Sequence, residues 1–96
     1  MKPSIALGVH REEIRALVGK YRTSTPRIFG SVARGDDGEE SDIDILIDTL
    51  PGATLFDLGG LQYDLQELLG AKVDVATSEG MRPRIRTRVM AEAVPL

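Results

Sequence analysis

The sequence predicts an α/β fold: a small mixed sheet of about three strands, with helices packed on one side of it. Two observations favour this class. Two long segments repeat their apolar residues with the period of a helix, whereas shorter segments alternate apolar and polar residues as strands do. In addition, the two alternating segments are separated by a single helical segment. A connection of that kind joins parallel, adjacent strands by a right-handed crossover.

The composition narrows the range of functions. With 96 residues, 42% of them hydrophobic, we expect one small domain spanning residues 1–96. The absence of cysteine excludes disulfides and thiolate metal sites, and the single histidine, His10, excludes a multi-histidine zinc site. No apolar run reaches the roughly 20 residues that cross a bilayer, so we expect a cytoplasmic protein. A net charge of −3 argues against extended nucleic-acid binding.

The first helix is predicted from about Ser4 to Tyr21, with a break or a loose first turn near Gly8. A polar linker over residues 23–26 leads from it into a short buried strand, Arg27 to Phe29. The apolar stripe of the helix recurs at i, i+3, i+4 and i+7. Its members are Ile14, Leu17, Val18 and Tyr21.

A glycine–serine pair follows this strand. Gly30 permits a sharp turn and a close approach of the backbone to a ligand. Ser31 is expected to cap a short helix that runs to Arg34 and ends at Gly35. The start of such a helix suits a phosphate, to which the Ser31 hydroxyl and the Arg34 charge would add contacts. The alternative is an ordinary strand–turn–helix junction. Residues 36–40, which follow it, are predicted to form a solvated acidic loop.

The second strand, from about Asp42 to Ile47, carries two carboxylates on one face. Asp42 and Asp44 lie about 6.6 Å apart at a rise of about 3.3 Å per residue, and the alternating Ile43, Ile45 and Ile47 face the core. Two carboxylates this close repel each other unless a cation lies between them. They could hold two Mg²⁺ ions, as in in-line phosphoryl displacement. The alternative is a solvated polar face, and we interpret Asp48 as the strand end and not as a ligand.

The next helix and strand extend this face. Thr54 is predicted to cap a leucine-rich helix that ends at Gly70, with Gly59-Gly60 marking a bend or a close approach to another backbone. The third strand covers residues 72–76. If its valines share the core with the isoleucines, Asp74 emerges beside the other two aspartates. An aspartate is a poor strand former, and this local conflict indicates a functional role.

The last helix is predicted from Arg82 to Ala93, with Ile85 and Val89 facing inward. Four arginines make it basic. Their positions give either a solvated face or a patch that holds nucleotide phosphates or an acidic partner surface. The arginines are Arg82, Arg84, Arg86 and Arg88.

Taken together, Gly-Ser-x-Ala-Arg-Gly, five further residues and Ser-Asp-x-Asp resemble the signature of the minimal nucleotidyltransferases of the DNA polymerase beta-like superfamily. The resemblance extends over the whole chain. It implies the polymerase beta-like fold, a Gly-Ser turn that binds the triphosphate of the incoming nucleotide, aspartates that bind Mg²⁺, and a third carboxylate on a neighbouring strand, the place of Asp74. The matching residues are Gly30, Ser31, Ala33, Arg34, Gly35, Ser41, Asp42 and Asp44.

The resemblance implies Mg²⁺-dependent nucleotidyl transfer with two metal ions and ATP as the donor. Asp74 would help hold the metal nearest the acceptor and accept its proton. The family contains antitoxins encoded beside HEPN-domain toxins, so the acceptor is expected to be a hydroxyl on such a toxin. Two alternatives remain: an antitoxin that masks its partner without catalysis, and the catalytic subunit of a two-chain transferase acting on a small molecule.

Overall fold

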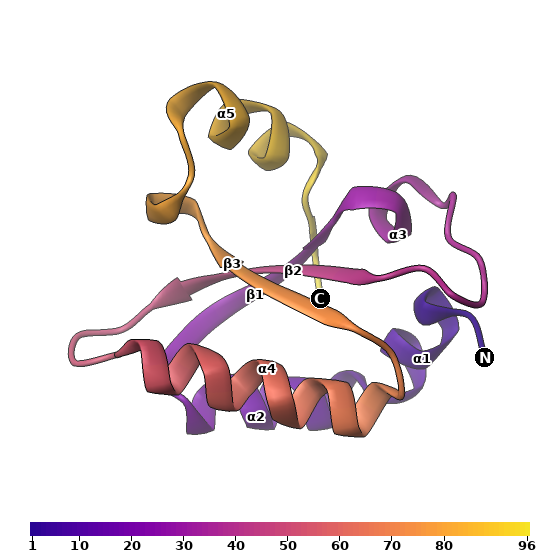
Figure 1. The fold of residues 1–96 in the computed structure, drawn as a ribbon, viewed down its shortest axis with the longest axis horizontal. Coiled ribbons are helices and arrows are strands. Elements are labelled where there is room, and N and C mark those ends of the chain that lie inside the picture. Colours follow the sequence, from indigo (N-terminus) through magenta and orange to yellow (C-terminus); the bar gives the residue numbers. More distant parts are fainter.

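The computed structural model describes all 96 residues as five α-helices, four strands and one short 3₁₀ turn (Figure 1). The helices are α1 (Pro3–Val9), α2 (Arg11–Lys20), α3 (Gly30–Arg34), α4 (Leu55–Leu69) and α5 (Pro83–Glu92). The strands are β1 (Thr23–Phe29), β2 (Ile43–Thr49), β3 (Val73–Thr77) and β4 (Val94–Pro95), and the 3₁₀ turn η1 covers Ser78–Gly80.

The strands form one sheet in the order β3-β2-β1-β4. β2 runs parallel to β3 and antiparallel to β1, and β4 pairs antiparallel with the free edge of β1. The predicted α/β class and the parallel pairing of β2 with β3 are confirmed. The sheet has four strands, one more than predicted, because β4 is only two residues long and includes a proline. Such a segment carries no period-2 pattern.

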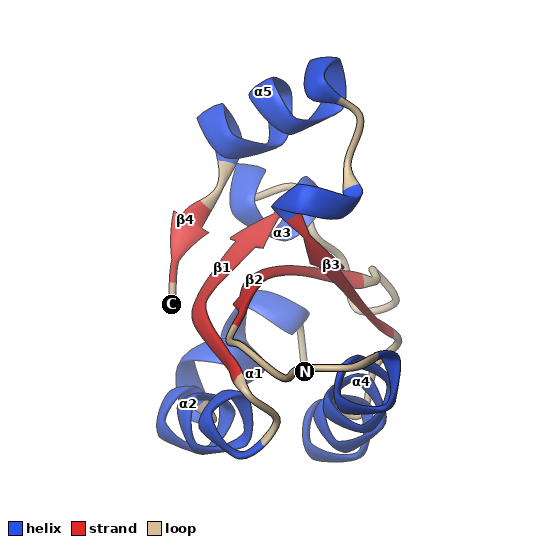
Figure 2. Ribbon diagram, turned by 90° about the vertical axis from the view of Figure 1, so that its left-hand side faces the viewer, coloured by secondary structure: helices blue, strands red, loops and turns tan.

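The helices are divided between the two faces of the sheet (Figure 2). α2 and α4 lie side by side beneath one face, with α1 next to them, as predicted for the helical layer. α5 stands over the opposite face, on the same side as α3. None of the five helices combines the length and the apolar composition that crossing a membrane requires.

The core lies between the sheet and the layer of α1, α2 and α4. The alternating isoleucines of β2 point into it and are fully buried, as the pattern predicts. Val73 of β3 and two leucines of α4 meet them there. The core cluster comprises Leu7, Ile14, Val18, Ile28, Val32, Ile43, Ile45, Ile47, Leu61, Leu65 and Val73.

Several element boundaries differ from the predictions. The first helix is broken at His10 into α1 and α2, two residues beyond the break expected at Gly8. β1 begins at Thr23 and includes the predicted linker, with an irregular pairing between Ser24 and Arg27. A proline in that stretch cannot donate to the ladder, which hides the strand from a pattern search.

The two predicted helix caps had different outcomes. Thr54 caps α4, and its backbone N–H donates to the Asp57 carboxylate at 2.9 Å, as predicted. Ser31 is not a cap, because α3 begins one residue earlier at Gly30 and Phe29 occupies the cap position. Gly35 ends α3 in the left-handed conformation, as predicted.

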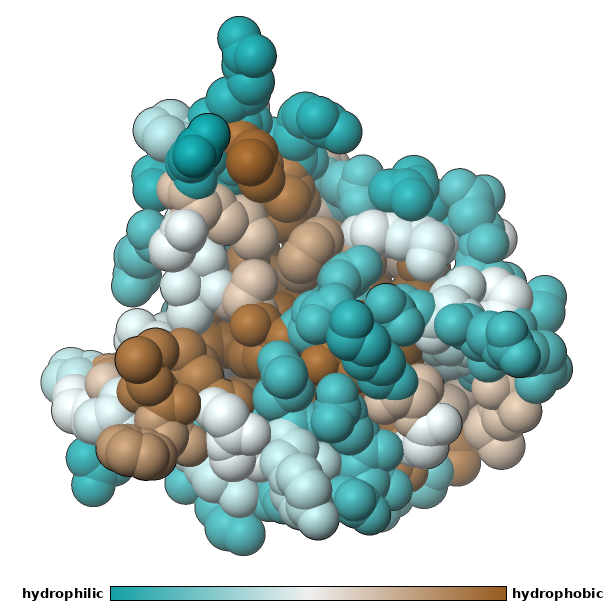
Figure 3. All heavy atoms as spheres, in the orientation of Figure 1, coloured by the Kyte–Doolittle hydropathy of each residue, from teal (hydrophilic) through white to brown (hydrophobic).

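α5 is the least embedded helix of the fold. None of its residues is buried, and Ile85, predicted to face inward, is 47% exposed. The apolar residues of α5 do recur at helical spacing, as predicted, but no other helix or sheet covers the face that they form. The first residues of α4 are similarly uncovered: Leu55 and Phe56 are 84% and 90% exposed, and apolar residues gather at that end of the helix in Figure 3.

Candidate active site

Two of the three predicted carboxylates lie at the same level of the sheet. Asp44 of β2 pairs in register with Asp74 of the parallel strand β3, and with Phe29 of the antiparallel strand β1. Residues paired in this way share a face of the sheet, and neighbouring strands are about 4.8 Å apart. Because Ile43 and Ile45 face the core, Asp44 and Asp74 lie together on the opposite face, beneath α5.

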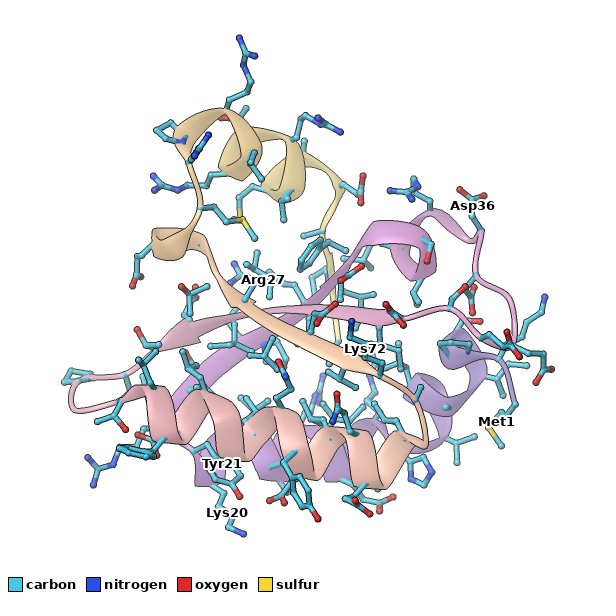
Figure 4. All side chains as sticks on the ribbon, in the orientation of Figure 1. Met1, Lys20, Tyr21, Arg27, Asp36 and Lys72 are labelled. Carbon is cyan, nitrogen blue, oxygen red and sulfur yellow. The ribbon has the colours of Figure 1, made fainter.

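Asp42 lies immediately before β2 and extends the acidic group toward solvent. Its side chain is 50% exposed, and its Oδ2 lies 3.9 Å from Nζ of Lys72. The Ile43 N–H donates to the Lys72 carbonyl at 2.9 Å, which fixes the chain beside the start of β3. Figure 4 shows Lys72 where β2 and β3 run side by side.

The neighbouring carboxylates act electrostatically on Asp44. Burial raises the pKa of Asp44 above its ordinary value, and the charges of Asp74 and Asp42 raise it further. Arg34 opposes this shift in the Asp44 pKa, whereas Glu92 adds to it. Burial and the surrounding negative charges therefore disfavour the ionised form of Asp44, and a bound cation would offset this effect.

The metal-binding hypothesis depends on the kind of ligand that the site offers. No three acidic or imidazole side chains converge closely enough to form a metal-binding cluster. The donor set nevertheless consists of carboxylate oxygens, the ligands that Mg²⁺ prefers, and Mg²⁺ commonly takes only one or two protein carboxylates together with substrate phosphates. The mutual repulsion at Asp44 fits the same ion.

The Gly-Ser turn lies directly against this acidic face. Gly30 has a φ of +75°, and a Cβ atom built there would come within 2.3 Å of Asp44 Oδ2. Any other residue would therefore collide with the carboxylate and strain the backbone. This contact brings together two motif parts that are 14 residues apart in the sequence.

The turn and α3 jointly bind an anionic group. The Gly30 N–H donates to Oε1 of Glu92 at 2.7 Å, and Arg34 Nη1 donates to the same oxygen at 3.1 Å. Arg34 Nε also donates to Asp36 at 3.3 Å. Glu92, the last residue of α5, did not emerge from the sequence: it is one of many acidic residues in the chain, and only the return of α5 over the sheet places it here.

Other polar groups on this face are already engaged. Arg27 of β1 pairs with Asp48 of β2 at 2.8 Å, so Asp48 belongs to an ion pair. Figure 4 shows Arg27 between the sheet and α5. The Nε of Arg27 is buried without a hydrogen-bond partner. The Ser31 hydroxyl makes no hydrogen bond within the chain.

Comparison with known proteins gives a consistent result. The sequence profile of the family described as "Nucleotidyltransferase domain" matches residues 9–96. "Putative protein adenylyltransferase MJ0435" of Methanocaldococcus jannaschii is 40% identical over 84 residues, which cover 88% of this chain and 90% of that protein. "Protein adenylyltransferase MntA" of Thermococcus cleftensis is 33% identical over 88 residues, 92% of this chain and 86% of that one.

Solved structures share the fold. One titled "Structure of putative minimal nucleotidyltransferase" superposes with a TM-score of 0.88 at 40% identity, over 97% of this chain and 95% of that chain. Another, titled "Crystal structure of the toxin-antitoxin with AMP-PNP", gives a TM-score of 0.75 at 20% identity. It covers 88% of this chain and 69% of that chain, and at this identity it supports the fold alone.

Proposed function

The chain belongs to the nucleotidyltransferase domain family and is a nucleotidyltransferase, and on this premise we propose that it transfers AMP from ATP, with Mg²⁺, to a hydroxyl group of a partner protein. The observation that carries the proposal is the contact between the Gly30 turn and Asp44. This contact supports a phosphate-binding role for the Gly30 turn, because the turn lies directly beside the Asp44 carboxylate of β2. Phosphoryl and nucleotidyl transfer depend mainly on this kind of positioning and charge stabilisation.

The turn and α3 would hold the triphosphate. The Gly30 N–H and the Arg34 guanidinium already converge on one carboxylate oxygen, and a phosphate oxygen offers the same charge and the same acceptor. The Ser31 hydroxyl would donate to a second phosphate oxygen. These groups would position the β- and γ-phosphates and leave the α-phosphate over the carboxylates.

The carboxylates would serve the transfer itself. Asp42, Asp44 and Asp74 would hold the two Mg²⁺ ions, which when bound supply charge neutralisation for the phosphates. The acceptor oxygen attacks the α-phosphorus, the bond from that phosphorus to the bridging oxygen of the β-phosphate breaks, and pyrophosphate leaves. The proton of the acceptor hydroxyl passes to the Asp74 carboxylate, which raises the nucleophilicity of the attacking oxygen.

We propose a HEPN-domain toxin as the acceptor. Two curated relatives are named as protein adenylyltransferases, and a toxin–antitoxin complex with AMP-PNP shares the fold. A partner protein can orient its own hydroxyl, so the chain itself need not enclose a small substrate. The exposed arginines of α5 stand on the same side of the sheet as the carboxylates and offer a docking surface for an acidic partner face.

The test is incubation of the chain with ATP, Mg²⁺ and the protein product of its genomic neighbour, followed by intact mass measurement and an assay of that protein's toxic activity. We expect AMP adducts on the toxin with the wild type and none with the Asp42→Asn, Asp44→Asn double variant. Asp74→Asn should lower turnover far more than ATP affinity. If the wild type and the double variant inhibit the toxin equally and no adduct forms, the chain silences its partner by binding and not by catalysis.

A further inference from the structure

We propose that Glu92 is an internal occupant of the phosphate position, and that a nucleoside triphosphate must displace Glu92, and with it the end of α5, in order to bind. This inference rests on the proposed function for the location of the phosphate position. It goes beyond that function because it gives α5 a regulatory role: the Glu92 carboxylate at its end occupies the phosphate position until a nucleotide displaces it.

The contacts of Glu92 are those that a phosphate oxygen would need. A single atom, Oε1, accepts from the Gly30 N–H at 2.7 Å and from Arg34 Nη1 at 3.1 Å. Hydrogen bonds from a guanidinium and a backbone N–H to an anionic oxygen are charge-assisted. Because one position cannot hold two anionic oxygens, the phosphate and the Glu92 carboxylate compete for Gly30 and Arg34.

The surroundings of Glu92 make the closed arrangement easy to open. Among the charges that act on Asp44, those of Asp74, Asp42 and Glu92 are negative and Arg34 supplies the positive one. A carboxylate at this position therefore faces repulsion from the acidic group as well as attraction from Arg34. A triphosphate that arrives with its cation brings positive charge, which the Glu92 carboxylate cannot provide.

Apart from Glu92, α5 is held by the segments at its two ends and not by burial of its own residues: β4, which follows it, pairs with β1, and η1 precedes it. None of its residues is buried, and Ile85 and Met90 are both exposed. At its opposite end Arg86 donates to the carbonyls of Ser78 and Met81, which are local contacts with the preceding turn. Release of Glu92 would thus uncover little apolar surface, while the start of the helix stays near η1 and the pairing of Val94 with Ile28 holds the chain beyond its end.

The first test measures ATP affinity in Glu92→Gln, which keeps the size of the side chain and removes its charge. We expect ATP to bind about tenfold more tightly than to the wild type, the scale of one charge-assisted hydrogen bond. Glu67→Gln is the matched control: Glu67 is exposed on α4, beneath the other face of the sheet, and makes no ion pair. It should bind ATP as the wild type does.

The second test follows the backbone amides of α5 by hydrogen exchange. In the wild type, the non-hydrolysable analogue AMP-PNP should speed exchange in residues 83–92, and Glu92→Gln should show the faster exchange without nucleotide. Unchanged or weaker ATP binding by a folded Glu92→Gln, with Gly30→Val still abolishing binding, would overturn this inference and leave the proposed function standing. Failure of wild type and Glu92→Gln alike to bind ATP would overturn both.

Discussion

At the scale of single residues, two positions make contacts between segments that are far apart in the sequence, and a small substitution at either would break its contact. Gly30 lies against Asp44, and Asp37 caps a helix 33 residues earlier in the chain. Both contacts join loops to elements far away in sequence. Substitutions at these two positions therefore test the site and the fold separately.

Replacing Gly30 by valine should disrupt both the turn and the carboxylate beside it. The new Cβ would meet Asp44 Oδ2, and a β-branched residue at a φ of +75° costs about 1–3 kcal/mol of strain. We expect ATP affinity, measured by calorimetry, to fall at least about tenfold. Gly38→Val is the control, because a Cβ there meets nothing within 4 Å and its φ is not positive. Full-strength ATP binding by Gly30→Val would remove the turn from the site.

Asp37 makes the stability depend on pH. It is buried, unlike the solvated loop residue that we predicted, because its carboxylate accepts the Ser4 N–H at 3.0 Å at the start of α1. That bond holds the pKa of Asp37 below its ordinary value. The ionised carboxylate thus stabilises the fold above the unfolded pKa of about 4, and this contribution is lost as the pH falls through the lowered folded pKa.

The Asp37→Asn variant should therefore be less stable than the wild type at pH 7, and the difference should shrink as the pH is lowered below about 4. Urea unfolding midpoints at a series of pH values measure it. Glu40→Gln in the same loop is the control, because Glu40 is exposed and makes no ion pair. A difference for Asp37→Asn that stays constant down to low pH would show that the charge has no part in it.

At the scale of elements, α4 packs against Tyr21 at the end of α2 through Gly60, the one glycine of α4 that has another residue within 4 Å of its Cβ position. Gly60 lies beneath the ring of Tyr21: a Cβ there would come within 2.6 Å of Cε1. The Tyr21 hydroxyl also donates to Asp64 one turn further along α4. We predicted that Gly59-Gly60 marks a bend or a close approach to another backbone. The close approach is real, but its partner is a side chain, and only the second glycine takes part.

Two single alanine variants distinguish the contributions of Gly59 and Gly60 to stability. Gly60→Ala should destabilise the fold by about 1–2 kcal/mol, since overpacking against Tyr21 outweighs the better helix propensity of alanine. Gly59→Ala, which meets nothing within 4 Å, should stabilise it by up to about 1 kcal/mol. Thermal or urea unfolding of both measures the contrast. Equal changes of the same sign would mean that Tyr21 moves aside freely.

At the scale of the whole molecule, the fold puts the proposed active site and the proposed docking surface on one side of the sheet. The helical layer of α1, α2 and α4 fills one face, so the carboxylates, the Gly30 turn and the arginines of α5 all lie toward the other. Figure 3 shows mainly hydrophilic residues over the end of the molecule where α5 lies. A partner that docks on α5 would therefore present its acceptor close to the carboxylates.

The Arg82→Ala, Arg84→Ala double variant tests this docking surface. Arg84 lies in the first turn of α5, about 12 Å along the helix from Glu92 at a rise of about 1.5 Å per residue, and Arg82 lies just before the helix. We expect a slower AMP transfer to the protein acceptor and a weaker salt dependence of its rate, with ATP affinity unchanged. Arg11→Ala, at the start of α2 on the opposite layer, is the control. An unaltered transfer rate in the double variant would place the partner elsewhere.

The sequence by itself determined what depends on local pattern: the α/β class, the buried isoleucines of β2, the crossover through α4, and a motif that joins a glycine turn to paired aspartates. Only the tertiary structure decided the break at His10, the edge strand β4, the burial of Asp37 and the arrival of Glu92 at Gly30. The reason is physical. Periodicity records which face of an element is covered, whereas contacts across 33 or 62 residues depend on how the elements are placed in space.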